Sequence, residues 1–293
     1  MTSCTFLPTD IEQVVQHALS EDIGSGDITA QLIPKNHQST AEVISRETAI
    51  LCGTAWFNEV FKQLGSIHKE NINIEWNTND GDTIQPDQVL CTLHGNARAL
   101  LTGERTALNF LQTLSGTATQ TRQYVDAIAK INTENKTRIL DTRKTLPGLR
   151  TAQKYAVVCG GGSNHRMGLF DAYLIKENHI LAAGSIAAAV AKAHMNNPEA
   201  SVEVEVENRD ELRQALQAGA NQILLDNMSL PKLREAVAFT QGRATLEASG
   251  NVNLDTVRDI AKTGVDFISV GSLTKHVRAV DLSMRFMAAP PTL

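Results

Sequence analysis

The sequence has no long apolar run, and no segment approaches the ~18 residues that a membrane-spanning helix needs. Its N-terminus, Met-Thr-Ser-Cys-Thr-Phe-Leu-Pro, lacks the basic region and apolar core of a signal peptide. From these two absences we expect a cytoplasmic protein with no membrane partner.

Cysteine is scarce and scattered, because only Cys4, Cys52, Cys91 and Cys159 occur and no CxxC pair is present. This pattern indicates reduced cytosolic thiols and favours neither a zinc site nor a disulfide framework. The chain has 293 residues, of which 42% are hydrophobic and 20% charged. That composition is typical of a globular protein with two domains, or with one large barrel and an extension.

Basic residues are not in excess overall, since the formal net charge is −5, yet one stretch reverses the sign. Between positions 138 and 179, seven Lys and Arg residues stand against three acidic residues. A local cationic patch in an acidic chain indicates an anionic small ligand rather than nucleic acid. The cations are Arg138, Arg143, Lys144, Arg150, Lys154, Arg166 and Lys176, and His165 precedes Arg166 on a glycine-rich loop.

The first 115 residues predict a small α/β sandwich domain. A capping-box pattern at 9–12 precedes a helix that should end near Glu21. Strand-like stretches follow at 41–52, 71–76 and 88–93. Residues 97–114 have helical periodicity, Ser115-Gly116-Thr117 should break that helix, and 119–131 should form another. We place the domain boundary at this break, between 115 and 116.

The region 116–275 alternates strands and helices. The expected strands are 139–141, 172–175, 202–206, 222–225, 245–248 and 267–270. From the third strand on, successive strands begin ~20 residues apart, a period typical of parallel βα units that close a barrel. The even spacing favours a barrel over a doubly wound open sheet, which remains the alternative.

Each predicted strand ends in polar residues, and in a βα barrel those ends converge on one face. Arg143 offers a bidentate fork to carboxylate or phosphate, and so does Arg166, whereas Lys144 and Lys176 offer mobile point charges. His165, which sits beside Arg166, joins this cationic basin.

Carboxylates face that basin from two strands. Glu203, Glu205 and Glu207 share one strand face and should point inward, with Glu205 nearer the mouth than Glu203. Asp226 ends the next strand. These groups can ligate Mg²⁺ or accept from sugar hydroxyls, or they can form internal salt bridges with Lys144 and Lys176.

The last two strands end in small residues that suit a phosphate monoester. Ser249-Gly250-Asn251 and Gly271-Ser272 each precede a helical stretch, so their backbone N–H groups are available to an anion. Gly160-Gly161-Gly162 lacks the Gly-Lys-Ser/Thr ending of a P-loop. The residues thus predict a mouth that holds a phosphate, a polyol with a metal, and a multiply anionic group.

An ordered set of motifs carries a resemblance to a known family. They are Thr-Arg-Lys-Thr at 142–145, Gly-Gly-Gly-Ser-Asn-His-Arg at 160–166, Lys-Glu-Asn-His at 176–179, Glu-Val-Glu-Val-Glu at 203–207, Leu-Leu-Asp-Asn at 224–227, Glu-Ala-Ser-Gly at 247–250 and Val-Gly at 270–271. Together they resemble quinolinate phosphoribosyltransferase, from the loop at 21–22 to the C-terminus.

The resemblance implies an incomplete α/β barrel with an N-terminal α/β sandwich, onto which residues 276–293 return. It also implies a homodimer with Mg²⁺ and a shared site, to which Gly-Glu-Arg-Thr-Ala-Leu-Asn at 103–109 contributes the neighbouring subunit's arginine at position 105. Quinolinate would contact Arg105, Arg143, His165, Arg166 and Lys176. The phosphoribosyl donor would contact Lys144, Lys176, Glu205, Asp226, Ser249, Gly250 and Gly271.

The implied reaction is phosphoribosyl transfer from 5-phosphoribosyl 1-pyrophosphate to quinolinate with decarboxylation, a glycosyltransferase step of NAD biosynthesis. Lys144, Glu205 and Asp226 would be catalytic, and Glu205 and Asp226 would hold the metal, directly or through water. Two alternatives remain: a relative that acts on nicotinate or another heterocyclic acid, and a non-catalytic barrel that binds a phosphate ligand.

Overall fold

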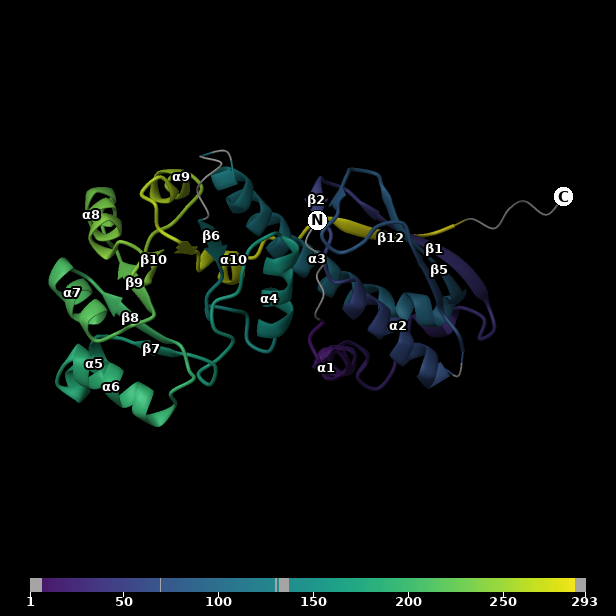
Figure 1. The fold of residues 1–293 in the computed structure, drawn as a ribbon. Coiled ribbons are helices and arrows are strands. Elements are labelled where there is room, and N and C mark those ends of the chain that lie inside the picture. The colour runs from purple at the N-terminus through teal and green to yellow at the C-terminus, as the bar shows by residue number, and fades with distance from the viewer. Residues whose placement is uncertain (1–6, 69, 130, 132–136, 288–293) are drawn as a thin grey trace. The chain divides into compact units, whose positions relative to one another are not determined.

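The computed structural model describes residues 7–68, 70–129, 131 and 137–287. They form two compact units (Figure 1). The first takes the described residues of 1–120, 146–161 and 276–293, and the second those of 121–145 and 162–275. The segment 146–161, which the sequence places in the barrel domain, thus groups with the first unit. The outer ends of the predicted ranges 1–115 and 276–293, and with them Cys4, lie outside the described residues.

The first unit is built on a four-stranded antiparallel sheet. Its order is β12(Leu282–Phe286), β1(Gln38–Ser45), β5(Val89–Asn96) and β3(Asn73–Trp76). A shorter pair is formed by β2(Ala49–Ile50) and β4(Thr83–Ile84). Because β12 pairs with β1, the chain after the second unit adds an edge strand to the first.

Helices α1(Ile11–Ile23), α2(Thr54–His68) and α4(Arg150–Cys159) share one hydrophobic core with this sheet. The short 3-10 helix η1(Ala30–Leu32) belongs to the same unit. Trp56 and Phe57 of α2 are fully buried, and the Trp56 ring meets that of Tyr155 in α4 with centroids 5.4 Å apart. The predicted capping box at 9–12 does not form, because the side chain of Asp10 accepts no helix N–H and instead accepts from the Thr151 hydroxyl at 2.8 Å.

The predicted helix break at 115–117 is wrong, since α3(Ala97–Ala129) runs through it without interruption. The Ser115 hydroxyl bonds both the N–H and the carbonyl of Cys52, so its polar group is satisfied inside the helix. A Cβ at Gly116 would lie 2.1 Å from the carbonyl oxygen of Arg278. Glycine is therefore required by a close backbone approach, and the helix continues through it.

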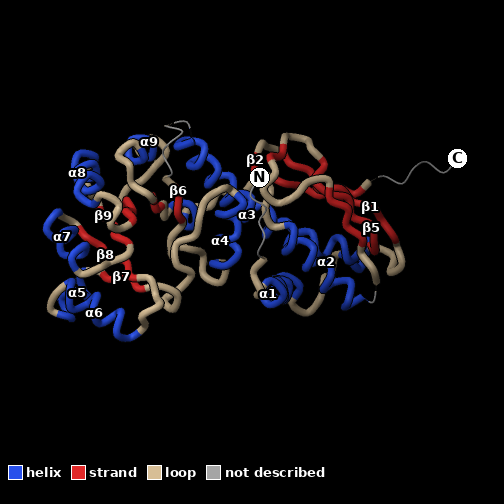
Figure 2. Tube along the Cα trace, in the orientation of Figure 1, coloured by secondary structure: helices blue, strands red, loops and turns tan. Residues whose placement is uncertain are grey.

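The second unit contains six parallel strands whose bounds lie within one or two residues of those predicted (Figure 2). They are β6(Arg138–Leu140), β7(Tyr173–Ile175), β8(Val202–Val206), β9(Gln222–Asp226), β10(Thr245–Ser249) and β11(Phe267–Ser269). The helices between them are α5(Glu177–Ala183), α6(Ile186–Asn196), α7(Arg209–Gln217), α8(Leu230–Thr240), α9(Val257–Ala261) and α10(Ser272–Lys275).

The strand order is that of a barrel opened at one seam. The sheet runs β6-β11-β10-β9-β8-β7. Strands β7 to β11 are therefore neighbours in their sequence order, and the first strand, β6, pairs with the last, β11. Among the described residues, β6 and β7 do not pair with each other, which leaves the barrel incomplete. No reversal of strand order occurs, and this excludes the doubly wound alternative. Across the described chain, even the 33-residue α3 is not apolar enough to cross a membrane.

Candidate active site

The carboxyl ends of the six parallel strands form the candidate site of the second unit. Because all six strands point the same way, the residues that follow them gather at one edge of the sheet. Of the predicted site residues, the structure brings ten to this edge: Arg143, Lys144, His165, Arg166, Lys176, Glu205, Asp226, Ser249, Gly250 and Gly271.

Lys176 and Glu205 meet at this edge. Lys176 directly follows β7, and its ammonium group donates to Oε2 of Glu205 on the neighbouring strand β8. The Glu205 side chain is 13% exposed and that of Lys176 is 45% exposed, so the pair sits at the boundary between core and solvent. The internal salt bridge that the sequence offered as an alternative is therefore present, and it keeps both charges paired.

Two guanidinium groups, those of Arg143 and Arg166, lie close enough to repel each other. Burial first, and then the charge of Arg143, lower the pKa of Arg166, while Glu203 and Asp171 counteract this. The Nε of Arg143 is buried and has no hydrogen-bond partner among the described residues. Like charges and an unsatisfied donor are costly in the absence of an anion, so an anionic ligand is the simplest compensation.

The loop that carries His165 and Arg166 is anchored to β6. Ser163 forms a parallel bridge with Leu140, and its N–H donates to the carbonyl of Ile139 at 2.8 Å. Asp141 is completely buried and accepts from the backbone N–H of His165 at 2.9 Å and from the amide of Asn164 at 2.6 Å. The glycine-rich segment thus ends in a fixed conformation, at the open edge of β6.

A buried polar layer lies beneath the mouth. The His165 Nε2 atom is 2.8 Å from Oε2 of Glu203 and 3.5 Å from Oε2 of Glu247. The amide of Gln222 donates to Glu203 at 3.0 Å and to Glu247 at 3.1 Å. Ser269 also bonds to Glu247. Four adjacent strands, β8 to β11, therefore each contribute one polar side chain to a single network.

The charge of this layer is balanced through protonation. Burial is the main cause that raises the pKa of Glu247 to about 8, and repulsion by Glu203 adds to it. His165 acts in the opposite direction. This raised pKa keeps Glu247 protonated near neutral pH, which relieves the repulsion between the two buried carboxyl groups.

Asp226 and Gly250 are linked through Asn227. The side-chain amide of Asn227 donates to Oδ2 of Asp226 at 2.7 Å, and its backbone N–H donates to the carbonyl of Ser249 at 2.9 Å. Gly250 has φ +103°, and a Cβ there would lie 2.1 Å from Oδ1 of Asn227. Glycine is therefore favoured at this turn. The hydrogen bond from Asn227 to Ser249 joins the ends of β9 and β10.

Lys144 lies over the end of β11. A Cβ built on Gly271 would stand 3.1 Å from Cδ of Lys144 and 3.8 Å from its Nζ. The loop holding Lys144 is fixed by the Thr274 hydroxyl, which donates to the Lys144 carbonyl at 2.8 Å. One predicted cation and one predicted phosphate-binding glycine are therefore neighbours.

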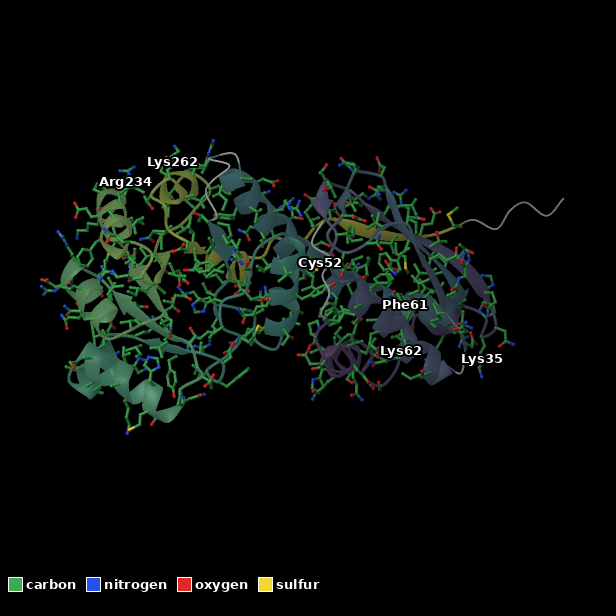
Figure 3. The ribbon with its side chains drawn as sticks, in the orientation of Figure 1. Lys35, Cys52, Phe61, Lys62, Arg234 and Lys262 are labelled. Atoms are coloured by element: carbon green, nitrogen blue, oxygen red, sulfur yellow. The ribbon has the colours of Figure 1, made fainter. Side chains whose placement is uncertain are left out.

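Arg105 belongs to the first unit. It is an exposed residue of α3, next to Glu104, whose pKa is raised by burial and lowered to a smaller extent by Arg105 itself. Arg105 therefore lies in a different unit from the ten residues at the strand ends. In the second unit, Arg234 and Lys262 lie on the outer helical side at α8 and the end of α9, away from the strands (Figure 3).

Sequence reasoning missed several members of the site. Asp141 was counted only as an opposing charge, although it anchors the histidine loop. Gln222 and Glu247 were not singled out, although both belong to the buried layer. The available signal was position. Gln222 and Glu247 are polar residues among the apolar residues of β9 and β10, and Asp141 directly follows β6.

Comparison with known families agrees with this architecture. Residues 27–115 match the N-terminal domain of quinolinate phosphoribosyl transferase, and residues 117–285 match the C-terminal domain of the same family. The chain belongs to the quinolinate phosphoribosyl transferase family. Residues 276–285, which include most of β12, thus fall within the match to the family's C-terminal domain, although they add a strand to the first unit.

Relatives in this family cover nearly the whole chain. A probable nicotinate-nucleotide pyrophosphorylase (carboxylating) of Bacillus subtilis is 41% identical over 94% of this chain and 92% of its own length. A quinolinate phosphoribosyltransferase (decarboxylating) of Nicotiana glauca is 40% identical over 94% of this chain and 82% of its own. The nicotinate-nucleotide pyrophosphorylase structure from Francisella tularensis is 50% identical, covers 98% of this chain and 100% of its own, and has a TM-score of 0.91.

Proposed function

We propose that this protein transfers the phosphoribosyl group of 5-phosphoribosyl 1-pyrophosphate to quinolinate with loss of CO₂, which yields nicotinate mononucleotide and pyrophosphate for NAD biosynthesis. Membership of the family supports this assignment. The observation in the structure that carries it is the pair of mutually repelling guanidinium groups of Arg143 and Arg166, in which the buried Nε of Arg143 has no hydrogen-bond partner among the described residues.

The acid would bind in the cationic basin. Arg143 and Arg166 supply planar donors that match two carboxylates, and the unsatisfied Nε of Arg143 gains a partner when the acid arrives. His165, held from below by Glu203, and Lys176 complete the set. A dianion relieves the repulsion between the guanidinium groups more fully than a monoanion does.

The donor would bind across the other strand ends. Ser249, Gly250 and Gly271 can approach a 5-phosphate closely through their backbone N–H groups, and Lys144 lies beside Gly271 to neutralise phosphate charge. Glu205 and Asp226, at the ends of neighbouring strands, would accept from the ribose hydroxyls. The acid and the donor would therefore occupy adjacent halves of one mouth.

The donor set fits Mg²⁺, which prefers a few carboxylates and keeps several other ligands as water and phosphate. Glu205 and Asp226 are on neighbouring strands, and each has one oxygen engaged by a neighbouring side chain, Lys176 or Asn227. These two carboxylates would hold the ion, directly or through water. When bound, Mg²⁺ would neutralise charge on the departing pyrophosphate.

In this reaction the protein would mainly position the two reactants and neutralise their negative charge. The ring nitrogen forms a bond to C1 of the ribose while the bond from C1 to pyrophosphate breaks. The resulting positive nitrogen stabilises the electron pair left on the ring when CO₂ departs, and that carbon then takes up a proton. Lys144 and the arginines hold both anions in place throughout.

The site would be completed by a second copy of the chain. Arg105 is an exposed cation in the first unit, in a motif that resembles the family's donated arginine. We propose a homodimer in which Arg105 reaches the mouth of its partner. We also propose a cytoplasmic location, in keeping with the buried thiols Cys52, Cys91 and Cys159.

The decisive assay is release of labelled CO₂ from carboxyl-labelled quinolinate. We expect release only when both the phosphoribosyl donor and Mg²⁺ are present, with pyrophosphate formed in equal amount. Release without the donor, or no release with all components, would contradict the proposed function.

The alternative acid, nicotinate, is tested in the same assay format. It offers one carboxylate, so part of the basin would stay uncompensated, and we expect at least ~100-fold lower kcat/KM than for quinolinate. Phthalate keeps both carboxylates without the ring nitrogen and should inhibit competitively. Comparable turnover of nicotinate would make a nicotinate-specific enzyme the better assignment, and binding without any turnover would favour the non-catalytic barrel.

A further inference from the structure

The buried layer beneath the mouth is more elaborate than a barrel interior requires. Glu203 and Glu247 have side chains that are 5% and 1% exposed, and His165 is 10% exposed. Interior layers of such barrels are ordinarily filled by branched apolar residues. Two buried carboxylates cost stability relative to apolar residues of similar volume, which suggests that they serve a purpose other than folding.

The contacts of this layer form a chain that begins at β11 and ends at His165 in the mouth. Ser269 bonds Glu247, and Gln222 joins Glu247 to Glu203 through both hydrogens of one amide. Glu203 then contacts the His165 ring at 2.8 Å. His165 belongs to the proposed acid-binding basin, whereas Glu247 and Gln222 lie inside the strands below it.

Two carboxylates fix His165, one through its backbone and one through its ring. Asp141 accepts from the backbone N–H of His165, which fixes the main chain, and Glu203 fixes the ring through Nε2. Oε2 of Glu247 lies 3.5 Å from the same ring nitrogen and shares the Gln222 amide with Glu203. A change at Glu247 should therefore alter the orientation of Glu203, the group that fixes the ring.

We propose that Glu247 is a positioning residue that acts through Gln222 and Glu203 to orient the His165 ring toward the carboxylates of the aromatic acid. The proposal rests on the proposed function, since it assigns His165 to acid recognition. Glu247 touches no reacting atom, and its contribution is the fixed direction of the imidazole.

The test compares Glu247→Gln with Gln222→Leu and with the control Glu199→Gln. The control removes an exposed carboxylate from the segment before β8, at the amino ends of the strands and outside the layer. We expect Glu247→Gln and Gln222→Leu to raise the KM for quinolinate and the Kd for phthalate about tenfold or more, while the KM for the phosphoribosyl donor stays within about twofold. The control should change neither constant.

A double-mutant cycle then tests the route of action. In a His165→Asn background, Glu247→Gln should add little further loss of phthalate affinity, because the ring it orients is gone. An undiminished additional loss, or equal losses of acid and donor affinity in the single variant, would overturn the proposal. An active wild-type enzyme with an unaffected Glu247→Gln variant would do so as well. If the wild-type protein neither binds phthalate nor turns over quinolinate, the proposed function fails instead.

Discussion

At the scale of single residues, the mouth of the barrel depends on residues in tightly packed or buried positions. Gly250 combines a φ of +103° with a potential Cβ contact of 2.1 Å to Asn227. Glu247 is almost fully buried, and it is held by neighbours on both adjacent strands. Both residues affect the site through structure and charge, and each gives a separable prediction.

Gly250→Ala should weaken donor binding selectively. The added Cβ must displace Asn227, which also holds Asp226, and the backbone conformation costs about 1–3 kcal/mol more for alanine. We expect the KM for the phosphoribosyl donor to rise at least tenfold, at ~1.4 kcal/mol per tenfold, with phthalate affinity nearly unchanged. Gly242→Ala is the matched control, because Gly242 has φ +72° with nothing within 4 Å of its Cβ position. A similar rise in the control would trace the effect to backbone strain alone.

Glu247→Gln should alter the pH dependence of stability. The pKa of Glu247 is raised to about 8 in the folded protein, against ~4.3 in an unfolded chain. Between these values the folded state binds the extra proton, so this residue's contribution to the free energy of unfolding falls as pH rises toward 8. Urea denaturation at several pH values from 5 to 8.5 should therefore give a steeper decline for the wild type than for the variant. Parallel curves would show that Glu247 does not titrate in this range.

At the scale of elements, α3 shows how packing overrides local sequence preference. Ser115 and Gly116 are helix-breaking residues in isolation, yet the helix runs from Ala97 to Ala129. Because Gly116 has no side chain, the backbone of the segment before β12 can approach it closely, and the Val280 N–H of that segment donates to the carbonyl of Gln112 at 3.0 Å. Helix α3 thus packs directly against the segment that leads into β12.

Gly116→Ala should destabilise the protein, although the same change in an exposed helix interior stabilises by about 1 kcal/mol. The Cβ would lie 2.1 Å from the Arg278 carbonyl oxygen, and backbone cannot yield as a flexible side chain does. We expect a loss of about 1–3 kcal/mol in the free energy of unfolding. Asn109→Ala, at an exposed position of the same helix, should be nearly neutral. A stabilised Gly116→Ala variant would contradict the close approach.

At the scale of the whole molecule, the chain interleaves its two units. The first unit is assembled from three separate stretches, since 146–161 and 276–287 join the N-terminal residues. Helix α4 contributes Ala152, Tyr155 and Ala156 to the core of that unit. Neither unit is a continuous segment of chain, so we expect that cutting between 115 and 116 would not yield two folded halves.

Complementation between inactive variants tests the proposed shared site. Arg105→Ala and Lys144→Ala should each abolish turnover as homodimers, because one removes the donated arginine and the other a cation of the mouth. After subunit exchange, a heterodimer of the two contains one intact site, so random mixing should restore about a quarter of the wild-type activity. Mass spectrometry would verify the exchange. Exchange without recovery of activity would argue against a site shared between subunits.

The sequence by itself determined the strands of the second unit, the polar residues that end them and the family. This was possible because short apolar strands with polar ends, separated by regular helices, leave a periodic pattern that is local in the chain. Lys176 after β7, Asp226 at the end of β9 and Ser249-Gly250 after β10 could all be placed in this way. Family resemblance added the roles that spacing alone does not give.

Only the tertiary structure decided which of these groups touch. The pairing of Lys176 with Glu205, the anchoring of His165 by Asp141 and the network through Gln222 and Glu247 join residues at least 19 positions apart. The uninterrupted α3 and the membership of 146–161 in the first unit likewise depend on contacts between distant segments. Such contacts arise from packing and from the need to satisfy buried polar groups, which no local pattern records.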